Sequence, residues 1–199
     1  MRRFPSFSAA LFALGLVAGP AHADQLLRLD PAACKVSFTL PATGHDVQGV
    51  LAVKSGEVLF DLPSGRASGE LVVDAKSSAT GNTSRDKKMH GEVLESEKYP
   101  LFVFKPEGIA GTLGAGENTV TLSGKLSVHG SEHPFKLPAT IRLEGDTVRG
   151  TTTFAVPFID WGMKDPGILF LRVGKEVNVT VEIRGRLEQG AAAGQAGSR

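Results

Sequence analysis

The sequence predicts a single all-β domain, an antiparallel barrel of eight strands with one short helix in a strand connection. Apolar and polar residues alternate along several segments, which is typical of strands with one buried face. Turn sequences such as Pro63-Ser64-Gly65 and Glu144-Gly145-Asp146 separate these segments, and sequential strands joined by tight turns pair antiparallel. Because an up-and-down barrel removes the exposed edges of so large a sheet, we favour it over a β-sandwich, the alternative architecture.

Length and composition fit one folded domain. The chain has 199 residues, of which 41% are apolar and 22% charged, and this composition excludes a disordered, collagen-like or disulfide-stapled chain. In the body of the chain, no run of about 20 apolar residues predicts an integral membrane segment. The formal charge of +1 gives no electrostatic reason to expect a nucleic acid partner.

The N-terminal residues 1–23 are expected to form a signal peptide. Arg2 and Arg3 precede the apolar run 9–18, and the small-x-small triplet 21–23 is typical of a signal-peptidase site. Cleavage after this triplet would remove both arginines and place the domain outside the cytoplasm, with the periplasm as the expected compartment. A buried N-terminal helix and a retained membrane anchor are the alternatives.

Strands are expected along most of the predicted barrel domain, residues 24–188. Alternation is clearest in the second half of the chain, at 120–128, 135–143, 148–156 and 177–183. Less regular strand segments are expected at 26–30, 36–40, 47–53, 57–60, 66–74 and 101–104.

One stretch, Thr83–Leu94, breaks the alternation and predicts a short helix. Thr83 and, three residues later, Asp86 resemble a capping box, and Met89 and Val93 lie on one helical face. The helix falls inside a strand connection, where it would cover one end of the barrel.

Two further segments are expected to lack regular structure. Residues 158–170 contain Trp161-Gly162 and Pro166-Gly167 and are too broken for a strand, so they predict an ordered loop. The Gly-, Ala- and Gln-rich residues 189–199 predict a disordered tail.

The familiar motifs of nucleophilic and zinc enzymes are missing from the sequence, so we predict no enzyme, no cofactor and no metal site. Asp86 and His90 are four residues apart on the predicted helix and would be close enough to touch. A helix-stabilising contact is favoured over a catalytic base, because no nucleophile is poised beside them. His129 and His133 flank a predicted turn and could converge on a metal, although solvated turn residues are favoured.

The single cysteine, Cys34, cannot form an internal disulfide. Its place at the start of an alternating segment favours a small buried residue. Intermolecular pairing and a redox-sensing thiol are the alternatives.

The middle of the chain carries a specific series of short motifs. Thr80-Gly81-Asn82 is followed, after two residues, by Arg85-Asp86 and then by Lys98-Tyr99-Pro100. Supporting segments follow at 122–130 and 161–166. In this order, the motifs resemble the YceI family of periplasmic, lipocalin-like polyisoprenoid-binding proteins.

The resemblance runs from residue 29 to about residue 187 and implies an eight-stranded lipocalin-like barrel that binds the isoprenoid or fatty chain of an amphiphile. It implies no enzymatic activity, and the motif 80–86 would support the barrel or contact the ligand. One departure is Ala33-Cys34, where many relatives carry a histidine and then a serine. If that histidine serves a ligand head group, its role is vacant here, and His45 could occupy a similar place.

Medium-sized side chains predominate at the expected inward positions, which favours a hollow apolar interior and a lipid-like ligand. From the alternation, the residues expected to line this interior are Phe38, Phe60, Leu71, Val73, Met89, Phe102, Phe104, Leu126, Val128, Phe154, Trp161 and Met163. The candidates for contacting a head group are His45, Arg85, Asp86 and His90.

The sequence therefore predicts a periplasmic binding protein for an isoprenoid or other long-chain amphiphilic lipid. A hydrolase that uses Asp86 and His90 on a hydrophobic substrate is one alternative. A ligand-free stress-response interaction protein is another, and it predicts a closed interior and an exposed apolar patch. The sequence leaves both a monomer and a homodimer open.

Overall fold

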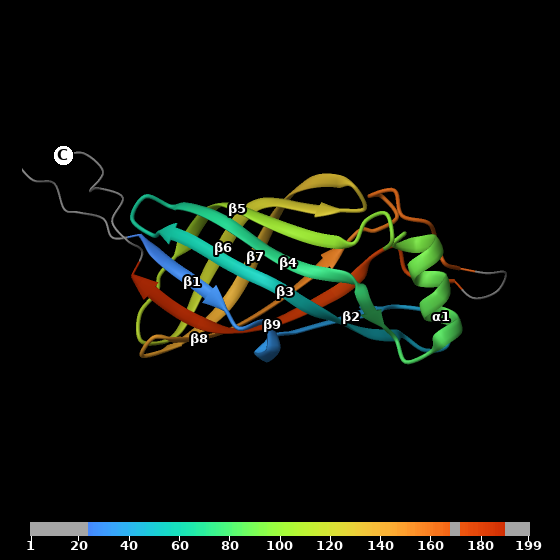
Figure 1. Cartoon of the computed structure of the whole chain (residues 1–199), viewed down its shortest axis with the longest axis horizontal. Coiled ribbons are helices and arrows are strands. Elements are labelled where there is room, and N and C mark those ends of the chain that lie inside the picture. Colours follow the sequence, from blue (N-terminus) through green and yellow to red (C-terminus); the bar gives the residue numbers. More distant parts are fainter. Residues whose placement is uncertain (1–23, 168–171, 190–199) are drawn as a thin grey trace, which may run out of the picture.

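The computed structural model describes residues 24–167 and 172–189, which form a closed antiparallel barrel with a helix at one end (Figure 1). The strands are β1 (Gln25–Leu29), β2 (Lys35–Leu40), β3 (Val47–Asp61), β4 (Arg66–Ala79), β5 (Leu101–Gly111), β6 (Gly116–Val128), β7 (Ser131–Glu144), β8 (Thr147–Val156) and β9 (Val177–Gln189). The helical segments are η1 (Pro31–Ala33), α1 (Thr83–Lys88) and η2 (Met89–Val93). The expected signal peptide, 1–23, lies outside the described residues, as do residues 190–199 of the expected tail, whereas Gln189 ends β9.

The nine strands occupy eight positions around the barrel, and we call each position a stave. The sheet order is β1-β3-β2-β9-β8-β7-β6-β5-β4, and pairing between β3 and β4 closes the ring. Both β1 and β2 pair with β3 on one side and β9 on the other, so they are two halves of one stave. The short 3-10 turn η1 at Pro31 interrupts this stave. The predicted eight-stranded barrel is confirmed, and its closure rules out the β-sandwich.

Bulges explain why the alternation located some strands only in part. The segments predicted at 47–53 and 57–60 belong to one strand, β3, whose register with β4 shifts twice between Val50 and Ser55. The strand predicted at 101–104 continues to Gly111, past a register shift next to Pro106. An extra residue in a strand inverts the inward and outward pattern beyond it, so the period of two is broken there.

Two apolar clusters occupy the ends of the barrel. At the end away from α1, the buried members are Val58, Phe60, Ala67, Ile109, Val120, Ile141 and Val148. Beside the helical segment, the buried members are Val93, Val128, Val156, Phe158 and Met163. Between these clusters, several inward side chains, such as Phe38, Leu71 and Val73, are only partly buried and line unfilled space in the barrel interior.

The helix begins at Thr83 as predicted, but its cap and its end differ from the prediction. Asn82 is the N-cap, and its side chain accepts a hydrogen bond from the amide of Arg85 at 3.0 Å. The predicted capping box is wrong, because Asp86 turns back to Thr80. From Met89 the helix widens into the π-turn η2, which ends at Val93. In the described ranges, no helix is long and apolar enough to cross a membrane.

The predicted loop after β8 is described from Phe158 to Gly167, and residues 168–170 lie outside the described ranges. Backbone hydrogen bonds order its first part, where the amides of Trp161 and Met163 donate to Pro157 and Phe158. This part of the segment is therefore an ordered loop, as predicted.

We predict that Asn82→Ala lowers the free energy of unfolding by about 1 kcal/mol, because it removes the acceptor of a helical N–H group. Thr83→Ala, at the position that the sequence pattern favoured, is the matched control and should change stability by less than about 0.5 kcal/mol. Urea denaturation followed by tryptophan fluorescence measures both variants. Equal losses in the two variants would contradict the assignment of the cap.

Candidate functional site

The barrel contains an apolar cavity of about 660 Å³, and every strand contributes to its wall. All the residues that the alternation placed inward line this cavity except Trp161. Strand residues follow the alternation because the period of two is a property of the extended backbone. Trp161 belongs to the loop after β8, where its ring stacks on His133 with centroids 4.0 Å apart. Its expected place in the lining was wrong because no local pattern orients a loop side chain.

Polar side chains enter the wall chiefly at the end covered by the helix. They come from the β2–β3 connection, the end of β4 and one face of α1, and they are Thr43, His45, Ser78, Thr80, Ser84, Arg85 and Lys88. Of the head-group candidates, His45 and Arg85 line the cavity, whereas Asp86 and His90 do not. Sequence reasoning missed Lys88, although its spacing of three residues from Arg85 places both on one helical face.

Thr80 joins Arg85 to Asp86 at this polar end. The amide of Thr80 donates to Oδ1 of Asp86 at 2.9 Å, and its hydroxyl donates to the same oxygen. Nε of Arg85 donates to the hydroxyl oxygen of Thr80 at 2.8 Å, and Nη2 donates to its carbonyl at 3.2 Å. The hydrogen bond from the Thr80 hydroxyl lowers the pKa of the Asp86 carboxyl, and the Arg85 charge adds to this effect.

Lys88 is held by a neutral oxygen. Its Nζ donates to the carbonyl of Pro166 at 2.8 Å and thereby ties α1 to the loop after β8. Within the described ranges, neither Lys88 nor Arg85 has a carboxylate oxygen within 4.0 Å. Two cations with neutral partners therefore stand at the polar end of an apolar cavity.

A second ion pair also fastens the helical segment to this loop. Nζ of Lys164 lies 2.6 Å from Oε2 of Glu92. The hydrogen bond from Lys164, together with its charge, lowers the pKa of the Glu92 carboxyl. Both partners are exposed, so the pair contributes little to stability. Its effect is to bring the loop against the helical segment.

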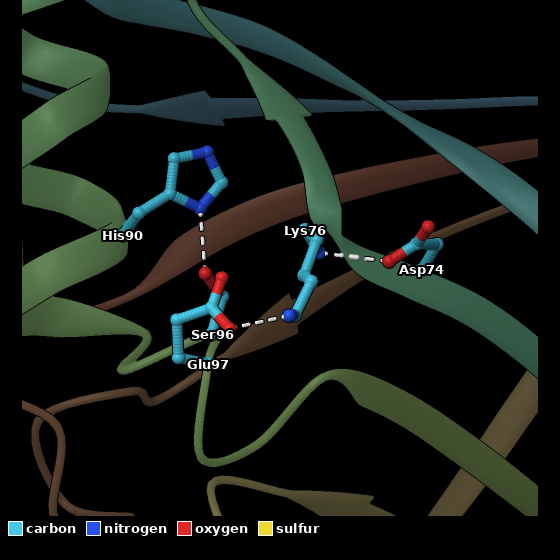
Figure 2. A network of polar contacts seen from close by, with 5 residues as sticks. All are labelled: Asp74, Lys76, His90, Ser96 and Glu97. Atoms are coloured by element: carbon cyan, nitrogen blue, oxygen red, sulfur yellow. Dashed lines mark hydrogen bonds and ion pairs between the residues drawn. The ribbon is translucent and has the colours of Figure 1, made fainter.

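His90, on η2, projects from the helical segment toward Ser96, as Figure 2 shows. Its Nε2 lies 2.8 Å from the carbonyl of Ser78, and its Nδ1 lies 2.9 Å from the hydroxyl of Ser96. A carbonyl can only accept, so Nε2 carries a proton and donates to Ser78. Beside it, Lys76 donates through its amide to Asp74 and through Nζ to Glu97 (Figure 2). These contacts fasten η2 and the residues after it to β4.

The predicted contact between Asp86 and His90 is not formed. Asp86 is bonded to Thr80, and His90 is bonded to Ser78 and Ser96. The hydroxyl of Ser96 is hydrogen-bonded to His90, as a nucleophile would be to its base. However, Ser96 is 3% exposed and does not line the cavity. Among the described residues, the base and nucleophile that the hydrolase alternative requires do not meet in the cavity.

The remaining histidines also have separate partners. Nε2 of His129 lies 2.8 Å from Oε2 of Glu95, and both residues have a positive φ, at 51° and 45°. His133 stacks on Trp161, so the two histidines do not converge. The described residues hold no group of three or more histidine, cysteine or acidic side chains that could bind a metal ion.

Cys34 caps η1, in the interruption between β1 and β2, and it is partly buried. Its Sγ lies 3.4 Å from the amide and 3.5 Å from the carbonyl of Arg184. Burial raises the pKa of the Cys34 thiol, which lowers its reactivity at neutral pH.

Comparison with known proteins agrees with this geometry. The YceI-like domain matches residues 27–185 of the chain. The chain belongs to this family. A UPF0312 protein from Pseudomonas savastanoi pv. phaseolicola is 30% identical over 176 residues, which cover 80% of this chain and 88% of the relative. A UPF0312 protein from Pseudomonas putida is 25% identical over 142 residues, which cover 67% of this chain and 72% of the relative.

Solved structures share the fold of this YceI-like chain at low sequence identity. BcnA from Burkholderia cenocepacia has a TM-score of 0.63 at 19% identity, over 78% of this chain and 98% of BcnA. A domain from Saccharophagus degradans, described as a polyisoprenoid binding domain implicated in plant cell wall breakdown, has a TM-score of 0.64 at 16% identity. That likeness covers 80% of this chain and 97% of the domain. At these identities, the likeness concerns the fold.

The lowered pKa of Asp86 predicts a pH-dependent contribution to stability. Folding favours the carboxylate, so the contribution is present above the unfolded pKa of about 3.9 and is lost as pH falls through the lower folded-state pKa. Asp86→Asn should therefore reduce the urea midpoint clearly at about pH 7 and much less at about pH 2. Asp46→Asn, at an exposed aspartate, is the control. A loss of equal size at both pH values would contradict the role of the charge.

Proposed function

We propose that the protein is a periplasmic carrier of an amphiphilic lipid, whose isoprenoid or fatty chain lies in the barrel cavity. The observation that carries this proposal is the interior of about 660 Å³ that the side chains leave unfilled. Burial of each methylene group contributes about 0.8 kcal/mol, so about a dozen buried carbons give tight binding without any polar contact.

The size of the cavity supports a long chain. A methylene group occupies roughly the same volume as a water molecule in the liquid, about 30 Å³. The cavity of about 660 Å³ therefore has room for roughly 20 carbons. This is the size of a long fatty chain or of a few isoprene units.

The polar end supports an anionic head group. Arg85 and Lys88 line this end, and their hydrogen bonds go to Thr80 and Pro166, which carry no charge. A carboxylate or phosphate there would pair directly with these two cations next to a medium of low dielectric, where ion pairing is stronger than in water. His45, from the β2–β3 connection, lines the same end.

The relatives support the isoprenoid chain in particular. The Saccharophagus degradans domain that shares this fold is described as a polyisoprenoid binding domain. A shared fold does not determine a ligand, so this likeness supports the proposal by analogy, whereas the cavity supports it directly.

The alternative of a ligand-free interaction protein has less support. It requires a filled interior and an exposed apolar patch, but the interior is hollow. Val50, which is 47% exposed, is the one exposed large apolar side chain in the described ranges. One such residue does not form a patch.

Mass spectrometry of the native protein tests both the compartment and the cargo. Protein from the periplasmic fraction should begin at Asp24, because residues 1–23 carry the features of a signal peptide. Under native conditions, the same protein should carry a lipid that organic extraction removes. A chain that stays with the cytoplasmic fraction would contradict export, and repeated recovery of an empty barrel would contradict the carrier role.

Substitution of the two cations tests the head group. Lys88→Gln and Arg85→Gln should each weaken the binding of palmitate by about tenfold, since each removes one charged contact. The binding of hexadecanol, which has the same chain and no charge, should change little. Displacement of a fluorescent fatty acid measures both ligands.

Lys87→Gln is the matched control, because Lys87 is exposed on α1 and does not line the cavity. Palmitate should bind to this variant as it does to the unchanged protein. Equal losses for palmitate and hexadecanol in the Lys88 variant would contradict recognition of an anionic head group.

A further inference from the structure

The barrel wall between β7 and β8 has a backbone ladder over only part of its length. β7 pairs with β6 from Ser131 to Leu143, but with β8 only from Thr140 to Glu144. Residues 152–156 of β8 pair with β9 and have no backbone partner on β7. Toward the helix, these two neighbouring staves are therefore not joined by backbone hydrogen bonds.

Two prolines on β7 explain where this ladder ends. Pro134 and Pro138 lie four residues apart, so their backbone groups face the same side of the strand. The carbonyl of Pro138 accepts a hydrogen bond from the hydroxyl of Thr152 on β8 at 2.6 Å. Because the N and C=O groups of a strand residue point to the same neighbour, the missing N–H of each proline faces β8. The sequence of β7 itself thus prevents a ladder here.

Aromatic side chains close the gap instead of backbone. The ring centroid of Phe135 on β7 lies 5.1 Å from that of Phe154 on β8 and 6.1 Å from that of Trp161. Trp161 also stacks on His133, with an angle of 4° between the rings. Nε2 of His133 is buried without a hydrogen-bond partner in the described structure. Packing of rings, together with the single hydrogen bond from Thr152 to Pro138, holds this part of the wall together.

The wall is thin where the ladder ends. A pocket of about 270 Å³ lies on the outside there, lined by Thr119, Pro138, Ala139, Thr140, Thr151, Thr152 and Thr153. Ala139, Thr151 and Thr152 line both this pocket and the internal cavity. The same few side chains thus separate the cavity from the outside.

We propose that this seam, formed by residues 134–139 of β7, residues 151–154 of β8 and Trp161, is a side mouth of the lipid cavity. The apolar chain of the ligand enters and leaves between the two staves while the helix stays in place. This inference rests on the proposed function, because it assigns a route to the same ligand.

The cost of opening favours the side mouth over the helical end. At the helical end, Lys88 ties the helix to the carbonyl of Pro166, and the amide of Thr43 donates to the carbonyl of Arg172. Parting the seam breaks the hydrogen bond of Thr152 and separates aromatic rings. An apolar chain that passes between these rings replaces their contacts with each other, so the loss is small.

Cross-linking of the seam tests this route. In a Cys34→Ser background, Lys136→Cys and Thr153→Cys place two exposed thiols across the seam while both prolines stay in place, and a short bismaleimide joins them. The release of bound dansylundecanoic acid, followed by stopped-flow fluorescence, should become about tenfold slower or more, since release requires the staves to part. The amount of probe bound at equilibrium should stay the same.

The matched control joins the other edge of β8. Ala155→Cys and Asn178→Cys lie opposite each other on the intact ladder between β8 and β9, and both positions are exposed. The same reagent should leave the release rate of this control unchanged. Release from the cross-linked seam that is as fast as release from this control would overturn the side mouth.

Removal of the ring that covers the seam gives the opposite change. Trp161→Ala should speed the release of the probe, and Trp161→Phe should give an intermediate rate. Rates equal to that of the unchanged protein in both variants would count against the side mouth. Failure of the uncrosslinked protein to bind the probe or any extracted lipid would instead contradict the proposed function.

Discussion

Closure of the barrel is the constraint on which the rest of the structure depends. Each stave pairs with two neighbours over at least part of its length, so the large sheet closes on itself. Eight staves fix a diameter at which the interior is either filled by large side chains or left open for one ligand. Here valines, leucines and threonines face inward from much of the wall, and a cavity of about 660 Å³ remains. The candidate site is therefore a result of the architecture more than of any single motif.

The helix at one end gives this cavity its polarity. Asn82 caps the helix, Thr80 joins Arg85 to Asp86, and His90 fastens η2 to Ser78. These contacts orient the helix so that Arg85 and Lys88 reach the cavity. The residues Thr80, Asn82 and Asp86 thus have mainly structural contacts, while Arg85 and Lys88 on the same helix supply the charge.

Interruptions of the backbone ladder give the barrel its individual features. The turn at Pro31 divides one stave in two and places Cys34 against Arg184. Bulges in β3 and β5 shift the register. At Pro134 and Pro138, backbone pairing between β7 and β8 is absent and aromatic side chains pack across the gap. Such packing opens more easily than a ladder of backbone hydrogen bonds. Variation within a closed barrel is concentrated at the positions where backbone pairing stops.

Local pattern was sufficient to predict most of the fold and most of the cavity wall. The period of two identifies strands and their inward residues, because the pleated backbone turns successive side chains to opposite faces. Met89, Phe102 and Leu126 line the cavity for this reason or for its helical equivalent. The same reasoning failed at Trp161, which lies in a loop, and beside the bulges, where one extra residue inverts the faces.

The sequence by itself determined the location of the helix, most of the strands and most of the inward residues, since each depends on near neighbours along the chain. The tertiary structure alone decided which partners distant residues find. Asp86 and His90 are four residues apart and could meet on a helix, but in the folded chain Asp86 bonds to Thr80 and His90 bonds to Ser96. The tertiary structure also decided that the lumen is open, because the free volume depends on how eight staves close around it. No segment contains that information.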